Sequence, residues 1–144
     1  MITNKSKGFT IIELLVVVAI IAVLASIVLV NVTQYIAKGK DAAIKGNLAT
    51  ILTNAAVFYD VQPSSTYVGF TTGGACATGD GTFTSARSAI VSAGGTVTCP
   101  NSTAAAFCVR STLNAGGSFC VDSTGYKGAP TLVGDCAGVD LTCL

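Results

Sequence analysis

The sequence contains no histidine and no tryptophan, and its only glutamate is Glu13. Histidine is the most frequent general base and metal ligand in proteins, and glutamate is another common catalytic carboxylate. The aspartates are scattered along the 144 residues. Because no histidine is present to activate a serine or cysteine nucleophile, the sequence predicts that this chain is not an enzyme.

Charge of either sign is also scarce. Charged residues make up 10% of the chain, whereas an average soluble protein has roughly 25%, and hydrophobic residues make up 51%. Part of the chain is therefore expected to lie away from water. The formal net charge is +1 and the basic residues form no cluster, so no nucleic-acid partner is predicted.

The apolar residues are concentrated in one run, residues 9–30, in which Glu13 is the only charge. As a helix this run would be roughly 33 Å long, enough to cross a bilayer once. Residues 1–8 form a short polar leader that carries Lys5 and Lys7. Positive charge before the span predicts a cytoplasmic N-terminus and export of the rest of the chain.

From residue 31 to residue 59 the apolar side chains recur every three or four positions, which predicts that the helix continues as an amphipathic segment. Asp41 and Lys45 lie four residues apart and can pair on its surface, although a solvated pair is worth only about 0.3 kcal/mol. The helix as a whole, from Thr10 to Tyr59, needs a partner for its apolar stripe. This stripe consists of Ile44, Leu48, Ile51, Leu52, Ala55, Phe58 and Tyr59.

The expected partner is the head, residues 60–144, which is rich in Gly, Ser and Thr. Segments rich in Val, Thr and Phe predict strands at 66–71, 96–99, 106–113 and 118–123, with a hairpin loop at 114–117. Ser85 is expected to start a short helix that ends before Gly94. The predicted fold class is α+β: a long N-terminal helix, half transmembrane and half amphipathic, packed on a small antiparallel sheet.

All six cysteines lie in the head, and none forms a CxxC pair. This spacing argues against a zinc knuckle or a thioredoxin-like redox site, and it predicts structural disulfides, which persist outside the cytosol. Many pairings are possible. Short local loops favour Cys76 with Cys99, Cys108 with Cys120, and Cys136 with Cys143.

The junction between the leader and the apolar run carries a more specific signal. Gly8 precedes Phe9, Glu13 follows four residues after Phe9, and an unbroken apolar helix continues to Val30. This stretch, GFTIIELLVVVAIIAVLAS at 8–26, resembles the N-termini of type IV prepilins and of the pseudopilins of type II secretion systems. The resemblance implies that a prepilin peptidase cuts after Gly8 and methylates the new amine of Phe9, and that the helix is retained.

The resemblance also implies partners and a location. The subunit would wait in the inner membrane as a single-pass protein. The pilus assembly machinery would then polymerise it into an extracellular homo-oligomeric filament for adhesion, motility or DNA uptake. Because a carboxylate in hydrocarbon needs a cation, Glu13 is expected to pair with the Phe9 amine of a neighbouring subunit. No cofactor and no metal are expected.

Two other functions of the N-terminal region stay open. A pseudopilin of a type II secretion system would carry the same motif. The residues before Ser26 form a passable cleavage site for a conventional secretory signal, although Glu13 inside the apolar run argues against it. Many pilins have a helix-breaking proline near the end of the span, where this sequence has Val30.

Weaker motifs lie elsewhere in the chain. Asp122, Asp135 and Asp140 could gather round calcium, but their spacing is not that of an EF-hand loop, so solvated loop acids are expected. Asn31 and Asn101 match the N-x-[ST] pattern and are expected to be ordinary polar residues.

Overall fold

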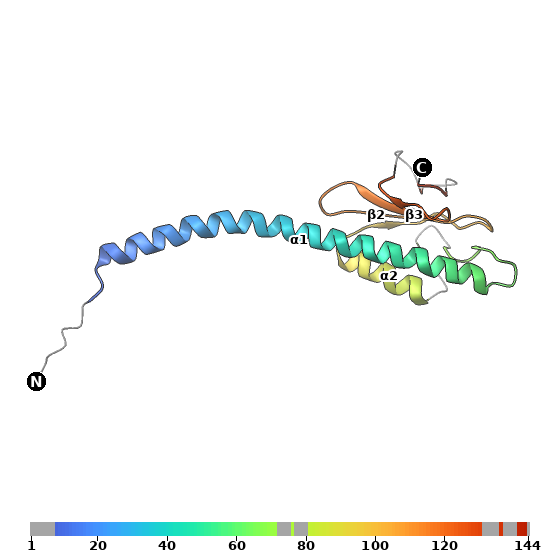
Figure 1. Ribbon diagram of the computed structural model, residues 1–144, viewed down its shortest axis with the longest axis horizontal. Helices are drawn as coiled ribbons and strands as arrows, with labels where there is room; N and C mark the ends of the chain where they lie inside the picture. Colours follow the sequence, from blue (N-terminus) through green and yellow to red (C-terminus); the bar gives the residue numbers. More distant parts are fainter. Residues whose placement is uncertain (1–7, 72–75, 77–80, 131–135, 137–140, 144) are drawn as a thin grey trace, which may run out of the picture. The chain divides into compact units, whose positions relative to one another are not determined.

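A computed structural model describes residues 8–71, 76, 81–130, 136 and 141–143. In chain order the elements are α1 (Ile11–Val61), α2 (Gly81–Ser92), β1 (Val97–Thr98), β2 (Cys108–Thr112), β3 (Ser118–Asp122) and β4 (Lys127–Gly128) (Figure 1). Contacts divide the chain into two units, residues 1–36 and 37–144, and α1 contributes to both. The predicted α+β class, with one long helix and a small antiparallel sheet, is confirmed.

The four strands form one antiparallel sheet in sequence order. β2 and β3 pair along their whole length, from Cys108 opposite Asp122 to Thr112 opposite Ser118. The loop between them is the predicted hairpin at 114–117, where Gly116 has a φ of 96°. Glycine adopts this left-handed conformation without steric cost, which explains the glycines at the turn.

One predicted strand is wrong. Residues 66–71 form a turn, in which the N–H of Phe70 donates to the carbonyl of Tyr67 at 2.9 Å and Gly69 has a φ of 88°. The bulky residues that suggested a strand here pack their rings in the core instead. Sequence reasoning also missed β4 and placed the start of α2 four residues late, at Ser85 rather than Gly81.

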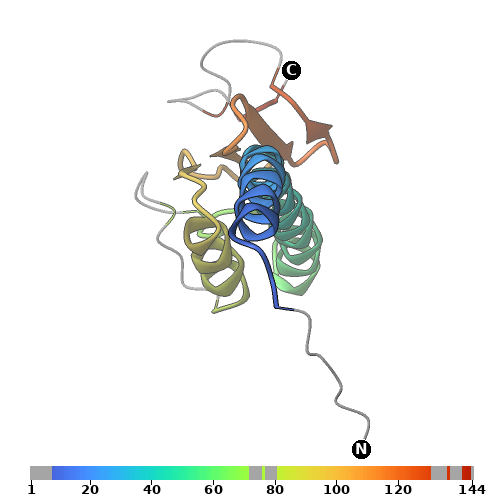
Figure 2. The same cartoon turned by 90° about the vertical axis from the view of Figure 1, so that its left-hand side faces the viewer.

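The first hydrophobic core of the C-terminal unit lies between the helices and one face of the sheet. In the two views α2 and the C-terminal part of α1 lie side by side, with the sheet beside both (Figures 1 and 2). The ring of Phe70 lies 5.1 to 5.4 Å from those of Phe58, Phe83 and Phe107. From the predicted stripe, Ile44, Leu48, Ile51 and Ala55 are fully buried.

A second, smaller core covers the opposite face of the sheet. Because side chains alternate along a strand, Val109 and Val121 point into the first core while Cys108 and Cys120 point away from it. The C-terminal segment covers these two cysteines with Leu141 and with two further cysteines, Cys136 and Cys143.

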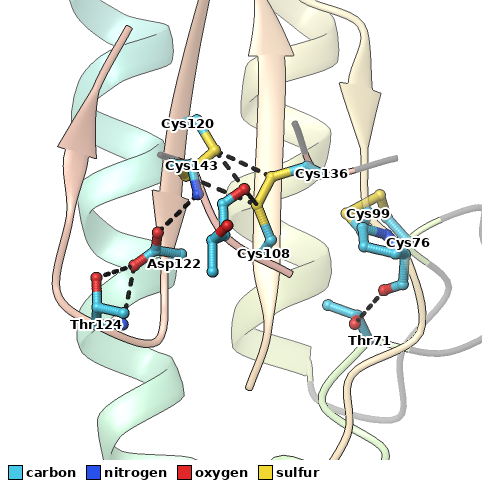
Figure 3. The surroundings of a disulfide bond; sticks show 11 residues. Thr71, Cys76, Cys99, Cys108, Cys120, Asp122, Thr124, Cys136 and Cys143 are labelled. Carbon is cyan, nitrogen blue, oxygen red and sulfur yellow. Dashed lines mark hydrogen bonds between the residues drawn. A yellow bond between two sulfur atoms is a disulfide. The ribbon is translucent and has the colours of Figure 1, made fainter. Parts of the chain in front are cut away.

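The disulfides follow from this arrangement (Figure 3). Cys76 is bonded to Cys99, as the local-loop argument favoured. The other two local pairings are wrong, because the bonds are Cys108 to Cys136 and Cys120 to Cys143. Cys108 and Cys120 share a sheet face but stand two register positions apart, and each bonds a different cysteine from the C-terminal part of the chain.

The expected ion pair between Asp41 and Lys45 does not form. Asp41 is buried and accepts hydrogen bonds from the N–H groups of Asn114 and Ala115 in the hairpin loop. The Lys45 ammonium lies 5.6 Å from the centre of the Phe119 ring, a cation–π distance. Hydrogen bonds between this buried carboxylate and the loop N–H groups outweigh a solvated ion pair on the helix surface.

Candidate functional site

The candidate processing site lies just before the first turn of α1. Gly8, Phe9 and Thr10 are outside the helix and exposed, and the Phe9 side chain is 80% exposed. A protease needs its substrate in such a non-helical, accessible conformation. Lys5 and Lys7 of the predicted leader lie outside the described residues.

Thr10 and Glu13 form a capping box at the start of α1. The N–H and the hydroxyl of Thr10 donate to Glu13 Oε2 at 2.9 and 2.8 Å, and the N–H of Glu13 donates to Thr10 Oγ1 at 3.3 Å. This reciprocal pattern satisfies N–H groups that the first helical turn leaves without partners. The helix therefore begins at Ile11 because the sequence supplies a threonine and a glutamate three residues apart.

The first half of α1 exposes an apolar surface on all sides. From Ile11 to Leu29, each large apolar side chain is between 48% and 80% exposed. An 18-residue window of α1 has a mean hydropathy of 3.1, and none of it is buried. By length and composition α1 is the one helix among the described residues that could cross a membrane. The core helix of a soluble protein can have the same length and hydropathy, but its side chains are buried, whereas those of this segment are exposed.

Phe9 lies two residues before the start of α1 and four residues before Glu13 in the chain. The capping box engages only Oε2 of Glu13. Within the described part of the chain, Oε1 of Glu13 has no hydrogen-bond partner. The carboxylate can therefore hold Thr10 and still accept a cation.

The structure does not support the expectation of a solvated Asp122. This residue is fully buried, its Oδ1 accepts from the N–H and hydroxyl of Thr124, and its Oδ2 accepts from the N–H of Cys143 at 2.8 Å (Figure 3). The hydrogen bond to Oδ2 attaches Cys143 to the end of β3. Asp135 and Asp140, the other two candidate calcium ligands, lie outside the described residues.

The structure also places the residues of the weaker motifs, Asn31 and Asn101, and of the alternative cleavage site, Ser26. Asn31 is an exposed residue within α1, and Asn101 is exposed in a loop. The Ser26 hydroxyl donates to the carbonyl of Val23 at 2.7 Å inside the continuous helix. A secretory cleavage before Ser26 would therefore have to cut a regular helical turn.

Sequence reasoning missed the structural roles of three polar residues, Thr10, Asp41 and Asp122. Thr10 had a readable signal, since T-x-x-E before an apolar run is a capping box. Asp41 and Asp122 had none, because their partners are Asn114 and Cys143, which are distant in sequence.

Comparisons with known proteins agree with the N-terminal geometry. Residues 3–29 match the family model of the prokaryotic N-terminal methylation motif. The chain is 44% identical over 62 residues to the type IV major alpha-pilin of Moraxella bovis, a stretch that covers 42% of this chain and 39% of that protein. It is 40% identical over 55 residues to the type IV major pilin protein PilA of Myxococcus xanthus, covering 38% of this chain and 25% of that protein.

A third relative is the fimbrial protein Q of Moraxella bovis, 44% identical over 62 residues, which cover 42% of this chain and 40% of that protein. The matched stretches thus span less than half the length of each of these relatives. No solved structure matches the chain. The family match contains Gly8, Phe9 and Glu13, so the chain carries a prepilin-type N-terminal segment.

Proposed function

We propose that this chain is a structural subunit of a type IV pilus. A prepilin peptidase cuts after Gly8, the new amine of Phe9 is methylated, and the mature subunit polymerises through α1 into an extracellular filament. The filament serves adhesion, motility or DNA uptake. The chain has no catalytic role in this proposal.

The observation that carries the proposal is the exposed apolar surface of α1 directly after the Gly8–Phe9 junction. Fully burying a Val, Leu or Ile side chain is worth about 1.5–3 kcal/mol, so a surface of this extent does not remain in water. The bilayer covers it before assembly. Outside the membrane only other copies of the same helix offer a matching apolar surface, and a bundle of helices buries all of them.

Glu13 sets how far neighbouring helices of the bundle are staggered along the filament axis. Cleavage creates a cationic amine at Phe9, and the free Oε1 of Glu13 accepts it from a neighbouring subunit whose helix is staggered along the filament axis. Neutralising both charges in an apolar bundle favours this one stagger over others. Thr10 keeps the carboxylate at the start of the helix through the capping box.

The experiment that tests the proposal is mass spectrometry of the N-terminal peptide from protein sheared off intact cells. We expect a peptide that begins with N-methylated Phe9. Cleavage also removes Lys5 and Lys7, so the mature chain keeps six basic residues against seven acidic ones. A peptide that begins at Ser26 would mean an ordinary secreted domain, and an intact Met1 in the membrane pellet would mean a simple anchor. Either result contradicts the proposal.

The alternative is a pseudopilin of a type II secretion system, because the N-terminal motif is common to both classes. The pilin relatives favour the first proposal over this one. The sheared fraction separates the two functions. A pilin with methylated Phe9 is recovered there, whereas a pseudopilin is processed in the same way but stays with the cell envelope.

A further inference from the structure

Four of the six cysteines converge at one point in the C-terminal unit. The Sγ atoms of Cys108, Cys120, Cys136 and Cys143 all lie within 4.8 Å of one another, and all four residues are fully buried. Between the two disulfides, Cys120 Sγ is 3.0 Å from that of Cys136, and Cys108 Sγ is 3.3 Å from that of Cys120 (Figure 3). Each sulfur thus has neighbours besides the one to which it is bonded.

We propose that these four cysteines, in the reduced chain, form a tetrathiolate binding site for one soft divalent metal ion of the zinc class. Four thiolates in tetrahedral geometry are the donor set that selects zinc among the common divalent metals. With a Zn–S distance of about 2.3 Å, the sulfurs of such a site are about 3.8 Å apart. The non-bonded separations of 3.0 and 3.3 Å are shorter than this value, so the cysteine side chains have to rotate apart when the disulfides open.

Contacts other than the disulfides also position three of the four cysteines. Cys108 and Cys120 share one face of the paired strands β2 and β3, which the ladder fixes. The Asp122 carboxylate accepts the N–H of Cys143 at 2.8 Å, and Leu141 is buried in the same cluster. These contacts hold Cys143 over the sheet when the sulfur–sulfur bonds are open.

The surroundings also offer positive charge to the metal-bound thiolates. Four thiolates and one divalent ion carry a net charge of −2, which needs compensation away from bulk water. Arg110 is directly opposite Cys120 in the strand register, so its side chain stands on the same face of the sheet. Both carboxylate oxygens of Asp122 already accept hydrogen bonds, from the N–H and hydroxyl of Thr124 and from the N–H of Cys143.

The chemistry balances with a phosphine as reductant. Each disulfide takes two electrons from one phosphine, and water supplies the oxygen of the phosphine oxide and the protons of the two thiols. Two phosphines open the cluster, and a third opens the bond between Cys76 and Cys99. One divalent ion then displaces four protons from the four thiols, so binding weakens as the pH falls.

The sequence pattern concealed this site. The spacing of the four cysteines contains no CxxC pair, and it predicted only disulfides. Cys108 and Cys120 come from the paired strands, and Cys136 and Cys143 come from the C-terminal part of the chain. Only the fold brings the four together.

The test uses the full-length chain in detergent micelles, reduced with phosphine and titrated with Co²⁺ as a spectroscopic substitute for Zn²⁺. We expect one ion per chain, the absorption bands of tetrahedral thiolate-bound cobalt, and loss of these bands when Zn²⁺ is added. The oxidised chain should show none of them. Absence of one-to-one binding in the reduced chain would overturn the proposal.

Alkylation of the Zn²⁺-loaded reduced chain identifies the ligands. Peptide mass spectrometry should find the four cluster cysteines protected, and Cys76 and Cys99 alkylated. Equal protection of all six would mean non-specific binding to thiols and would overturn the proposal.

Two double variants complete the test. The change Cys76→Ser with Cys99→Ser leaves the cluster intact and should keep the cobalt bands. The change Cys120→Ser with Cys143→Ser should abolish the tetrathiolate bands. If the reduced chain unfolds, Zn²⁺ should restore the circular dichroism of the first variant but not of the second. Failure to restore the first, or equal restoration of both, would contradict the site. None of these readouts depends on filament assembly.

Discussion

The carboxylate of Asp41 on α1 accepts a hydrogen bond from the N–H of Asn114, 2.6 Å away in the loop of the β2–β3 hairpin. It also accepts the side-chain amide of Asn114 and the N–H of Ala115, each at 3.0 Å. The Asn114 amide donates in addition to the carbonyl of Ala93, just beyond α2. One buried carboxylate thus joins α1 to the hairpin, and its partner extends the connection to α2.

This arrangement predicts how the stability of the C-terminal unit depends on pH. Burial by itself raises the pKa of Asp41, but the hydrogen bonds from Ala115 and Asn114, with the charge of Lys45, outweigh it and hold the pKa below its ordinary value. Because the folded pKa is the lower one, the carboxylate stabilises the fold above its unfolded pKa. This contribution is lost as the pH falls through the folded value. The thermal unfolding midpoint of the full-length chain should therefore drop on acidification below about pH 4.

The variant Asp41→Asn isolates this residue. Its amide presents N–H donors where the loop needs an acceptor, so the midpoint at pH 7 should fall and the acid-dependent part should shrink. The matched control is Asp60→Asn, an exposed carboxylate near the end of α1, which should behave like the parent chain. Equal acid sensitivity in the parent and Asp41→Asn would show that another group controls the transition.

Gly95 is predicted to be essential for packing, whereas Gly46 is not. A Cβ atom at Gly95 would lie 2.5 Å from Ser111 Oγ on β2, 2.8 Å from Ile90 Cγ2 on α2 and 3.1 Å from Ile44 Cδ1 on α1, so these buried side chains would have to move apart. We expect Gly95→Ala to destabilise the fold by about 1–3 kcal/mol, the usual cost of overpacking. Gly46 is an exposed helical residue with no atom within 4 Å of the added carbon.

The control Gly46→Ala should stabilise the chain by up to about 1 kcal/mol, the difference in helix propensity. Chemical denaturation of both variants, followed by circular dichroism, measures the two effects. Similar destabilisation by both changes would mean that helix bending rather than contact at Gly95 is responsible.

The regular parts of this fold could be predicted from the sequence because their signals are local. The apolar run, the three- and four-residue spacing of Ile44, Leu48 and Ile51, and the glycines of the hairpin loop each specify their own segment. The same kind of reasoning was wrong at 66–71, where Val, Tyr and Phe suit a strand but Gly69 turns the backbone. The presence of bulky residues does not by itself distinguish a strand from a turn that packs in the core.

The polar connections could not be predicted, since each joins positions far apart in the chain. Asp41 was expected to choose Lys45, its neighbour on the helix, and instead meets a loop whose position depends on the whole sheet. The two wrong disulfide pairings fail for a similar reason. Loop length favoured Cys108 with Cys120, whereas strand register and the covering segment decide the actual partners.

The disulfide connectivity predicts the products of an unreduced digest. Trypsin cuts after Lys45, Arg87, Arg110 and Lys127, so the cysteines fall in peptides 46–87, 88–110, 111–127 and 128–144. The observed bonds join all four peptides into one species. Local pairing of the last four cysteines would instead release peptide 128–144 with an internal bond.

A second digestion distinguishes the observed bonds from the remaining arrangement of the same four cysteines. Cleavage before Asp140 separates Cys136 from Cys143. Cys136 should then stay with the peptide of Cys108, and Cys143 with that of Cys120. The exchanged combination in the mass spectrum would refute the observed pairing.

Glu13 has two roles in this account, capping α1 and pairing with the Phe9 amine, and two substitutions separate them. Glu13→Gln keeps the capping box, because glutamine serves at this position, but removes the charge. Thr10→Val removes the hydroxyl of the box but keeps the charge. Both variants should be cleaved after Gly8. If charge pairing sets the register, filament yield from sheared cells should fall by at least about tenfold for Glu13→Gln and stay near the parent level for Thr10→Val. The reverse order would mean that Glu13 acts through the helix cap, and equal loss in both would mean that neither role can be removed alone.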